Sequence, residues 1–159
     1  MSLPPFEHNG MPLDPGIRLL EASAGTGKTF ALAHLVLRLL SEGPRPLAIE
    51  QLLVVTFTDA AAAELRDRIA RRLQQALALL EAAATTPGEA ELPADLDQPL
   101  EQWLAARGPD PSAQLRGRLL LALVQMARGA ITTLPGFCRR PLQRQALEAG
   151  LGPAVALEQ

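Results

Sequence analysis

Apolar residues follow two patterns along this chain, short unbroken runs and longer stretches with helical spacing. Runs rich in apolar or β-branched residues predict three short strands, at residues 17–21, 51–56 and 130–134. Apolar residues three and four positions apart predict helices at residues 30–40, 60–84, 112–128 and 136–149, with a shorter one at 100–106. Strands that alternate with helices in this way predict an α/β fold, in which a parallel sheet carries an inserted helical subdomain.

The stretch between the long second helix and the third strand differs in composition from its surroundings. Five prolines and several acidic residues fall between residues 85 and 111, which favours loops over regular structure. We therefore divide the chain into a first part of the α/β lobe at 1–84, a loop-rich and helical insertion at 85–128, and a return to the lobe at 129–159. Trp103 is expected to pack the short helix of this insertion onto the body, a role that we prefer to base stacking.

The overall composition limits the classes of protein to which the chain can belong. Hydrophobic residues make up 48% of the 159 residues, and no run of about 18 apolar residues occurs, which predicts a soluble globular protein without a membrane span. A net charge of −2 argues against a chain that coats itself with nucleic acid through bulk charge. For the arginine clusters at 66–72 and 139–144 we therefore prefer a solvated helix face to a nucleic-acid patch.

Cysteine and histidine are rare in this chain. Cys138 is the only cysteine, so the chain forms no internal disulfide, and a reducing cytoplasm is the expected location. Its thiol is expected to behave as a small buried side chain. His8 and His34 have no Cys, His or carboxylate neighbours at ligand spacing, so they predict no metal site in the protein itself.

Lys28 is the only lysine, since the other 14 of the 15 basic residues are arginine. It belongs to the motif Ala-Ser-Ala-Gly-Thr-Gly-Lys-Thr at 22–29, between the first predicted strand and the first predicted helix. In a phosphate-binding loop, glycines let backbone N–H groups close around a phosphate, and the helix N-terminus adds a partial positive charge. The residues predicted to bind a phosphate-bearing cofactor are Ala22, Ser23, Ala24, Gly25, Thr26, Gly27, Lys28 and Thr29.

Two of these residues carry the chemistry of the motif. Lys28 would reach the β- and γ-phosphates, and the Thr29 hydroxyl would hold Mg²⁺. Ala22 stands where the usual pattern has its first glycine. A glycine-rich turn with a solvated lysine is the weaker alternative, because both the motif and its place between strand and helix favour a phosphate loop.

Three motifs, in this order, closely resemble the opening motifs of superfamily 1 DNA helicases of the UvrD/Rep type. They are Glu-Ala-Ser-Ala-Gly-Thr-Gly-Lys-Thr at 21–29, Val-Val-Thr-Phe-Thr-Asp at 54–59 and Ile-Thr-Thr-Leu-Pro-Gly-Phe-Cys at 131–138. Within the superfamily, the first and third motifs are most similar to the beta subunits of exodeoxyribonuclease V, the RecB family. The resemblance implies a P-loop NTPase (RecA-like) motor lobe with an incomplete parallel sheet, and ATP with Mg²⁺ as its cofactors.

The second and third motifs are implied by the resemblance to contact DNA. The implied DNA-binding residues are Thr56, Phe57, Thr58, Arg66 and Thr133. Threonine hydroxyls and helix N-terminal amides can hold phosphates, and an aromatic ring can stack on a base. For Phe57, core packing is the alternative that the residue type alone favours.

Two prolines depart from the expected pattern. Pro135 stands where the family commonly has a histidine, and proline has neither a side-chain donor nor a backbone N–H, which puts a DNA contact from this position in doubt. Pro141 is expected to break the last helix.

The carboxylates needed for ATP hydrolysis do not occur in these motifs. Hydrolysis needs one carboxylate for Mg²⁺ and another to activate water, and no apolar strand of this sequence ends in Asp-Glu. We therefore predict no catalytic residue in this chain and interpret it as the N-terminal ATP-binding fragment of an ATP-dependent DNA helicase and exonuclease subunit. The resemblance implies recombinational repair of double-strand breaks, with single-stranded DNA, duplex ends and the gamma and alpha subunits of exodeoxyribonuclease V as partners.

Two other functions remain open from the sequence. The departure at Pro135 and the missing acids suit a short non-enzymatic protein that binds nucleotide or DNA. A small P-loop kinase is a weaker alternative, because residues 56–58 would have no role in it. An incomplete sheet is expected to leave apolar edges exposed, so we also expect the chain to associate with itself.

Overall fold

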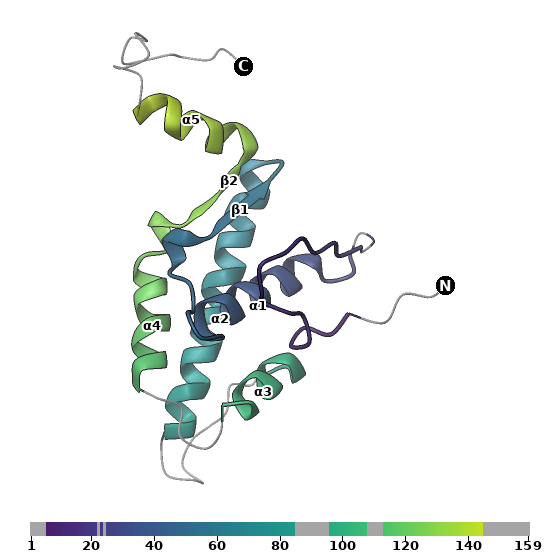
Figure 1. The fold of residues 1–159 in the computed structure, drawn as a ribbon, viewed down its shortest axis with the longest axis vertical. Helices are drawn as coiled ribbons and strands as arrows, with labels where there is room; N and C mark the ends of the chain where they lie inside the picture. The colour runs from purple at the N-terminus through teal and green to yellow at the C-terminus, as the bar shows by residue number, and fades with distance from the viewer. Residues whose placement is uncertain (1–5, 22, 24, 85–95, 108–112, 145–159) are drawn as a thin grey trace.

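The computed structural model describes residues 6–21, 23, 25–84, 96–107 and 113–144 (Figure 1). Its elements are α1 (Lys28–Ser41), the 3-10 turn η1 (Ile49–Gln51), β1 (Leu53–Thr56), α2 (Asp59–Ala84), α3 (Gln98–Ala105), α4 (Ala113–Val124), the 3-10 turn η2 (Met126–Arg128), β2 (Ala130–Thr133) and α5 (Leu134–Arg144). All five predicted helices and the second and third predicted strands are confirmed, with shifts at their ends; residues 145–149 of the last predicted helix lie outside the described residues.

The sheet consists of the parallel pair β1 and β2 within the described part of the chain. Leu53 lies opposite Ala130, and Thr56 lies opposite Thr133. Between the two strands the chain passes through α2, α3 and α4, which makes the pair a crossover connection and confirms the α/β fold. Both strands end at the same edge, beside the first turn of α5 (Figure 1).

The prediction of a buried strand at residues 17–21 is wrong. This segment has no regular structure, and the Ile17 and Leu19 side chains are 98% and 85% exposed. A strand needs a neighbour for its backbone hydrogen bonds, and β1 and β2 pair only with each other among the described residues. An apolar run of five residues is therefore not enough to fix a strand here.

The core lies between the helices, mainly where α1, α2 and α4 meet. Its largest buried side chains include Leu37, Leu40, Ile69, Leu73, Leu80 and Leu119. The apolar face predicted for the long helix is the face of α2 that packs into this core. Figure 1 shows the long α2 below the strands, with α4 alongside it and α1 crossing it.

Trp103 joins α3 to this core, as the sequence predicted. Its side chain is 1% exposed, and its indole N–H donates to the Ser41 hydroxyl at 3.1 Å. The guanidinium of Arg107 lies over the indole ring, 3.8 Å from the ring centroid. Burial of a large ring with its one polar atom satisfied is favourable, so this contact fixes α3 against the end of α1.

A buried cluster of polar side chains joins four parts of the chain, namely the N-terminal segment, α1, α2 and the start of α3. Arg72 of α2 donates to Nδ1 of His34 on α1, with 2.7 Å between Nη2 and Nδ1, and binds both carboxylate oxygens of Asp97 before α3. Asn9, in the N-terminal segment, contacts Nε2 of His34 at 2.8 Å and donates to the Pro99 carbonyl at 2.8 Å. The solvated face predicted for the arginines of α2 is therefore wrong for Arg72, which is 3% exposed.

Two further expectations fail at α5. The sequence predicts a buried Cys138, but its side chain is exposed on α5, a helix whose main contacts are with the strands β1 and β2. Pro141 was expected to break the helix, yet α5 continues to Arg144. A proline removes its own amide donor but not those of its neighbours, so a helix can pass it and end within one turn, as this one does.

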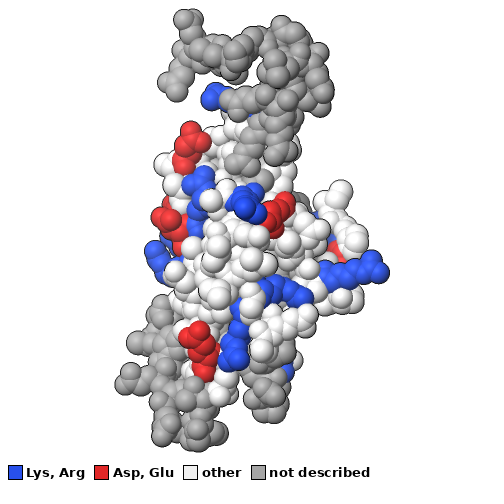
Figure 2. Space-filling model, turned by 90° about the vertical axis from the view of Figure 1, so that its left-hand side faces the viewer, with Lys and Arg blue, Asp and Glu red and all other residues white. Residues whose placement is uncertain are grey.

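The face shown in Figure 2 carries basic and acidic side chains interspersed with uncharged ones. No helix in the described ranges is long and apolar enough to cross a membrane.

The buried His34 makes stability depend on pH. Burial, and then the charge of Arg72, lower the pKa of His34 to about 3, whereas a histidine of the unfolded chain titrates near 6.5. The unfolded state therefore takes up a proton first as the pH falls. The free energy of unfolding is expected to decrease from pH 7 to pH 5, by up to about 1.4 kcal/mol per pH unit, in urea titrations.

The matched control for this pH dependence is His34→Gln, which should show a smaller slope. Burial also lowers the pKa of His8, so the variant should keep the part of the slope that His8 supplies. A free energy of unfolding that is flat between pH 7 and pH 5 in the unchanged chain would contradict the assignment of a neutral, buried His34.

Candidate functional site

The glycine-rich loop before α1 has the backbone of a tight turn. Gly25 and Gly27 have φ angles of 79° and 83°, in the left-handed region that other residues enter only with strain. A Cβ atom at either position would meet nothing within 4 Å, so the backbone angle and not space requires glycine here. Thr26 closes the turn, because its hydroxyl donates to the Ser23 carbonyl at 2.7 Å. Ala22 and Ala24 lie outside the described residues.

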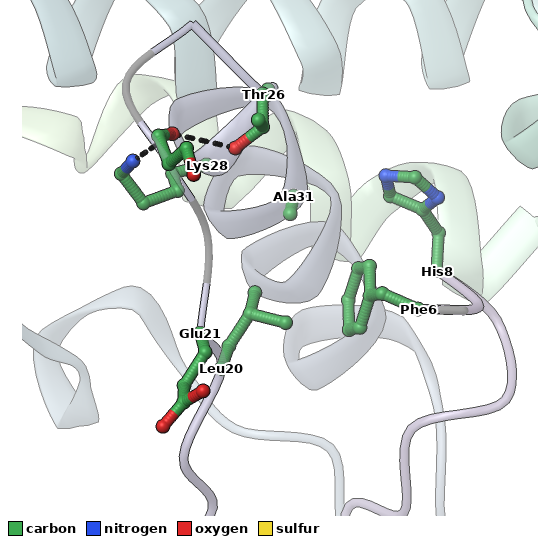
Figure 3. A pocket seen from close by; sticks show the side chains of 9 residues that line it. Phe6, His8, Leu20, Glu21, Thr26, Lys28 and Ala31 are labelled. Carbon is green, nitrogen blue, oxygen red and sulfur yellow. Dashed lines mark hydrogen bonds between the residues drawn. The ribbon is translucent and has the colours of Figure 1, made fainter. Parts of the chain in front are cut away.

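Lys28 is the first residue of α1, and its ammonium group reaches back across the loop to the Ser23 carbonyl (Figure 3). Gly27 precedes the helix in a left-handed conformation, and no described side chain caps it. The N–H groups of a first helical turn have no partners within the helix, and they carry its partial positive charge. The loop therefore places an ammonium group and a positively polarised helix end at one point. Thr29 follows as a half-buried residue of the same turn.

A cavity of about 530 Å³ opens beside this loop. Ser23, Thr26, Gly27 and Lys28 line its polar end, while Phe6 and His8 line another wall (Figure 3). The two rings pack edge to face, with centroids 4.9 Å apart. The arrangement can hold an anionic group at the polar end and a flat apolar group against the rings.

The aromatic wall is held in place from behind. Arg38 of α1 donates to the carbonyl of His8 at 3.0 Å and to that of Met11 at 2.8 Å. Burial, and then the charge of Arg72, lower the pKa of His8, so its ring is neutral at pH 7. This wall could not be predicted from the sequence, because residues 6–11 contain no motif.

Three of the predicted DNA-binding residues come together where β1 ends. Thr56 is the last residue of the strand, and its hydroxyl donates to the Thr58 carbonyl at 3.0 Å. The Thr58 hydroxyl accepts from the Ala61 amide at 3.1 Å, so it caps α2. Between them Phe57 is 100% exposed, which rules out core packing for its ring. Ligands bind preferentially at the carboxyl edge of parallel strands, and this edge holds all three residues.

Thr133 lies at the same edge but is buried, with 7% exposed. Its hydroxyl donates to Asp59 at 3.4 Å and accepts from the Gly136 amide at 3.3 Å, where it caps α5. A Cβ on Gly136 would lie 2.6 Å from the Thr132 hydroxyl, so the motif needs glycine for this close approach. Pro135 sits in the first turn of α5, where the lost amide donor costs little.

Arg66 is not part of this exposed edge. It donates to the Ile131 carbonyl at 3.1 Å and so ties α2 to β2. A contact of Arg66 or Thr133 with DNA stays a prediction, as do the roles of the loop residues 22–29. The described residues contain no group of three His, Cys, Asp or Glu side chains placed to hold a metal ion.

A comparison with known protein families finds one that matches nearly the whole sequence. The family described as UvrD/REP helicase N-terminal domain matches residues 8–159. This chain belongs to that helicase family. The resemblance carried by the three motifs is therefore confirmed.

Several curated relatives of this UvrD/REP family chain carry names that describe their assemblies. The RecBCD enzyme subunit RecB of Escherichia coli K12 is 46% identical over 86% of this chain. RecB of Haemophilus influenzae is 39% identical over 85%, and an ATP-dependent helicase/nuclease subunit of Desulforamulus reducens is 33% identical over 85%. The chain spans only 11% of the length of either RecB relative and 8% of the third.

Two glycine substitutions should change the free energy of unfolding in opposite directions. Gly27→Ala forces a side chain into a left-handed backbone and should lower the free energy of unfolding by roughly 1 kcal/mol. Gly117→Ala, in the interior of α4 where a Cβ meets nothing within 4 Å, should raise it by roughly 0.5–1 kcal/mol. Urea unfolding of both variants measures the difference. A Gly27→Ala chain as stable as Gly117→Ala would contradict the left-handed turn.

Proposed function

We propose that this chain is the ATP-binding part of a P-loop NTPase (RecA-like) motor lobe in a helicase. The observation that carries the proposal is the turn of residues 25–28, which brings the one lysine and the N-terminus of α1 to the edge of a cavity of about 530 Å³. Family membership supports it, since the matched family is one of helicases. The name of the relative from Desulforamulus reducens describes it as ATP-dependent.

The residues around the cavity fit a magnesium nucleotide. Backbone N–H groups of residues 25–27 and the first turn of α1 would surround the β-phosphate, and Lys28 would bind the β- and γ-phosphates. Mg²⁺ prefers oxygen ligands and commonly takes one from a hydroxyl and others from phosphates, which suits Thr29 beside the loop. Phe6 and His8 offer flat apolar surface for the base.

Single-stranded DNA is the second ligand that we propose. Phe57 is a fully exposed ring at the carboxyl edge of the sheet, flanked by two threonines and followed by the N-terminus of a 26-residue helix. An exposed ring can stack on any base, and helix amides can bind a phosphate next to it. Thr133 and Arg66 would then act mainly by holding β2 and α2 in position at this edge.

The activity and the partners of a whole protein are proposed from the relatives, of whose length this chain spans 11% or less. We propose that it belongs to an ATP-dependent DNA helicase and exonuclease subunit that works on duplex ends in recombinational repair. The proposed partners are the gamma and alpha subunits of exodeoxyribonuclease V, and the proposed location is the cytoplasm. No residue of this chain is proposed to be catalytic, so the chain alone should bind ATP without turning it over.

The alternative of a short, non-enzymatic binding protein is not favoured. The helicase family model covers residues 8–159, and several RecB proteins match along most of the chain. The same family match argues against a small kinase. A kinase would also leave the exposed Phe57 without a role.

Removing the one lysine tests the nucleotide site. Lys28→Ala should abolish measurable Mg-ATP binding in a calorimetric titration, because this sequence contains no other lysine to replace the lost charge. Arg45→Ala removes an exposed charge from the loop after α1 and serves as the control that should bind normally. Unchanged affinity in Lys28→Ala would remove the phosphate-loop assignment.

Truncating the exposed ring tests the DNA site. Phe57→Ala should weaken binding of a fluorescent thymidine oligonucleotide by roughly tenfold, which is the value of one stacked base. The free energy of unfolding should stay within about 0.5 kcal/mol, because the ring contacts nothing that folding buries. Phe57→Trp keeps an aromatic face and should retain affinity. Equal affinities for the alanine and tryptophan variants would argue against stacking.

A further inference from the structure

A second cavity, of about 220 Å³, lies between α1, α2 and the residue that caps α3. Three arginines of α2 line it, Arg68, Arg71 and Arg72, together with Phe30 of α1 and Asp97. It shares no lining residue with the cavity beside the glycine-rich loop. We call this second cavity the arginine groove. Its lining holds three positive charges and one negative charge.

Arg72 forms the floor of the arginine groove and is already satisfied. Its guanidinium binds His34 and both oxygens of Asp97, and it lies 4.7 Å from the centroid of the Phe30 ring. Burial alone would raise the pKa of Asp97, but the hydrogen bonds from Arg72 and the Leu100 amide, together with the charge of Arg72, lower it, so the carboxylate stays ionised. Arg72 therefore supplies a fixed positive charge that is not free to leave the groove.

Arg68 and Arg71 lie at the rim of the arginine groove, where their guanidinium groups have N–H donors available for a ligand. Arg68 pairs with Glu64 at 2.8 Å, but the two side chains are 47% and 59% exposed, and an ion pair this open is weak. Arg71 is exposed and makes no hydrogen bond or ion pair with any described residue. The two residues are three positions apart on α2, so their side chains project on the same side of the helix.

A phosphate group is the ligand that best matches this arrangement. Guanidinium groups are planar forks that bind phosphate with paired hydrogen bonds, and arginine is less strongly hydrated than lysine. The one carboxylate of the lining is engaged by Arg72 and by the Leu100 amide, so it leaves the rim arginines to an incoming anion. A volume of about 220 Å³ admits one phosphate with part of its neighbouring group.

We propose that the arginine groove binds a phosphate group, with Arg68 and Arg71 as its direct ligands. We further assign that phosphate to the backbone of a nucleic-acid strand, an assignment that rests on the proposed function. The helix that carries both arginines begins at Asp59, two residues after the exposed ring of Phe57. Arg71 is twelve residues along it, about 18 Å from its start, so a strand of a few nucleotides spans both sites.

Inorganic pyrophosphate is the probe for the site itself. The titration uses the 159-residue chain with Lys28→Ala, so that the glycine-rich loop does not contribute to binding. Adding Arg71→Gln should weaken pyrophosphate binding by about tenfold, the value of a hydrogen bond to a charged group. Adding Arg45→Gln instead removes the same charge elsewhere and should leave binding unchanged. Equal binding by these two variants would overturn the proposal.

A thymidine oligonucleotide then distinguishes a strand from a free anion. In the chain with Lys28 intact, Arg71→Gln should lower the dependence of log affinity on log salt concentration by about 0.7, the value of one single-strand phosphate contact. Arg45→Gln should leave this slope unchanged. A loss of pyrophosphate binding with no change of slope would overturn the strand as the source and leave a site for free phosphate anions.

Failure of the proposed function would look different from failure of this proposal. If Lys28→Ala binds Mg-ATP normally, the phosphate-loop assignment falls, while both comparisons of Arg71→Gln with Arg45→Gln still decide the groove. Both residues are exposed, so neither variant should unfold the chain. Urea unfolding of each variant verifies this before binding is measured.

Discussion

One buried charge, that of Arg72, joins separate parts of the chain through its hydrogen bonds. Arg72 lies inside the protein, and a buried guanidinium is tolerated only where carboxylates and hydrogen-bond acceptors surround it. Its partners come from separate parts of the sequence, His34 on α1 and Asp97 at the cap of α3, and Asn9 holds His34 from the other side. Because a guanidinium can only donate, Nδ1 of His34 accepts from Arg72 and Nε2 carries the ring proton toward Asn9. One residue thus fixes a tautomer, a helix end and the path of the N-terminal segment.

That constraint reaches the cavity beside the glycine-rich loop. His8 is adjacent to Asn9, and its ring packs edge to face against Phe30, which in turn lies under Arg72. The wall opposite Lys28 is therefore positioned by the same cluster that seats α3. A ligand that contacts the His8 ring is therefore linked, through Phe30 and Arg72, to Asp97 at the start of α3.

The helices were predictable from the sequence, because apolar spacing on α1, α2 and α4 reports burial on one face. The strands were less so. Residues 53–56 and 130–133 pair with each other, whereas 17–21 has the same apolar character but no described strand beside it. Whether an apolar run becomes a strand depends on distant neighbours, which composition does not encode.

The candidate site divides in the same way. Gly25, Gly27 and Lys28 could be predicted, because their roles follow from local backbone angles and from a helix end. The exposure of Phe57 could not be predicted, because it depends on whether another part of the chain packs against the edge of the sheet. Arg72 carried a faint signal, because it falls among the apolar positions of α2, between Ile69 and Ala76. A charged residue on a buried stripe requires a partner, but the sequence does not say that the partners are His34 and Asp97.

The scarcity of lysine has a practical consequence. Amine-selective reagents have one side-chain target in this chain, and it sits at the mouth of the cavity, next to the Ser23 carbonyl. Apart from the chain's own amino terminus, any acylation therefore reports on a single atom, Nζ of Lys28. Lys28 is thus a single site for chemical labelling at the place where the proposed cofactor would bind. The degree to which a ligand protects Lys28 from acylation would measure how far this cavity is occupied.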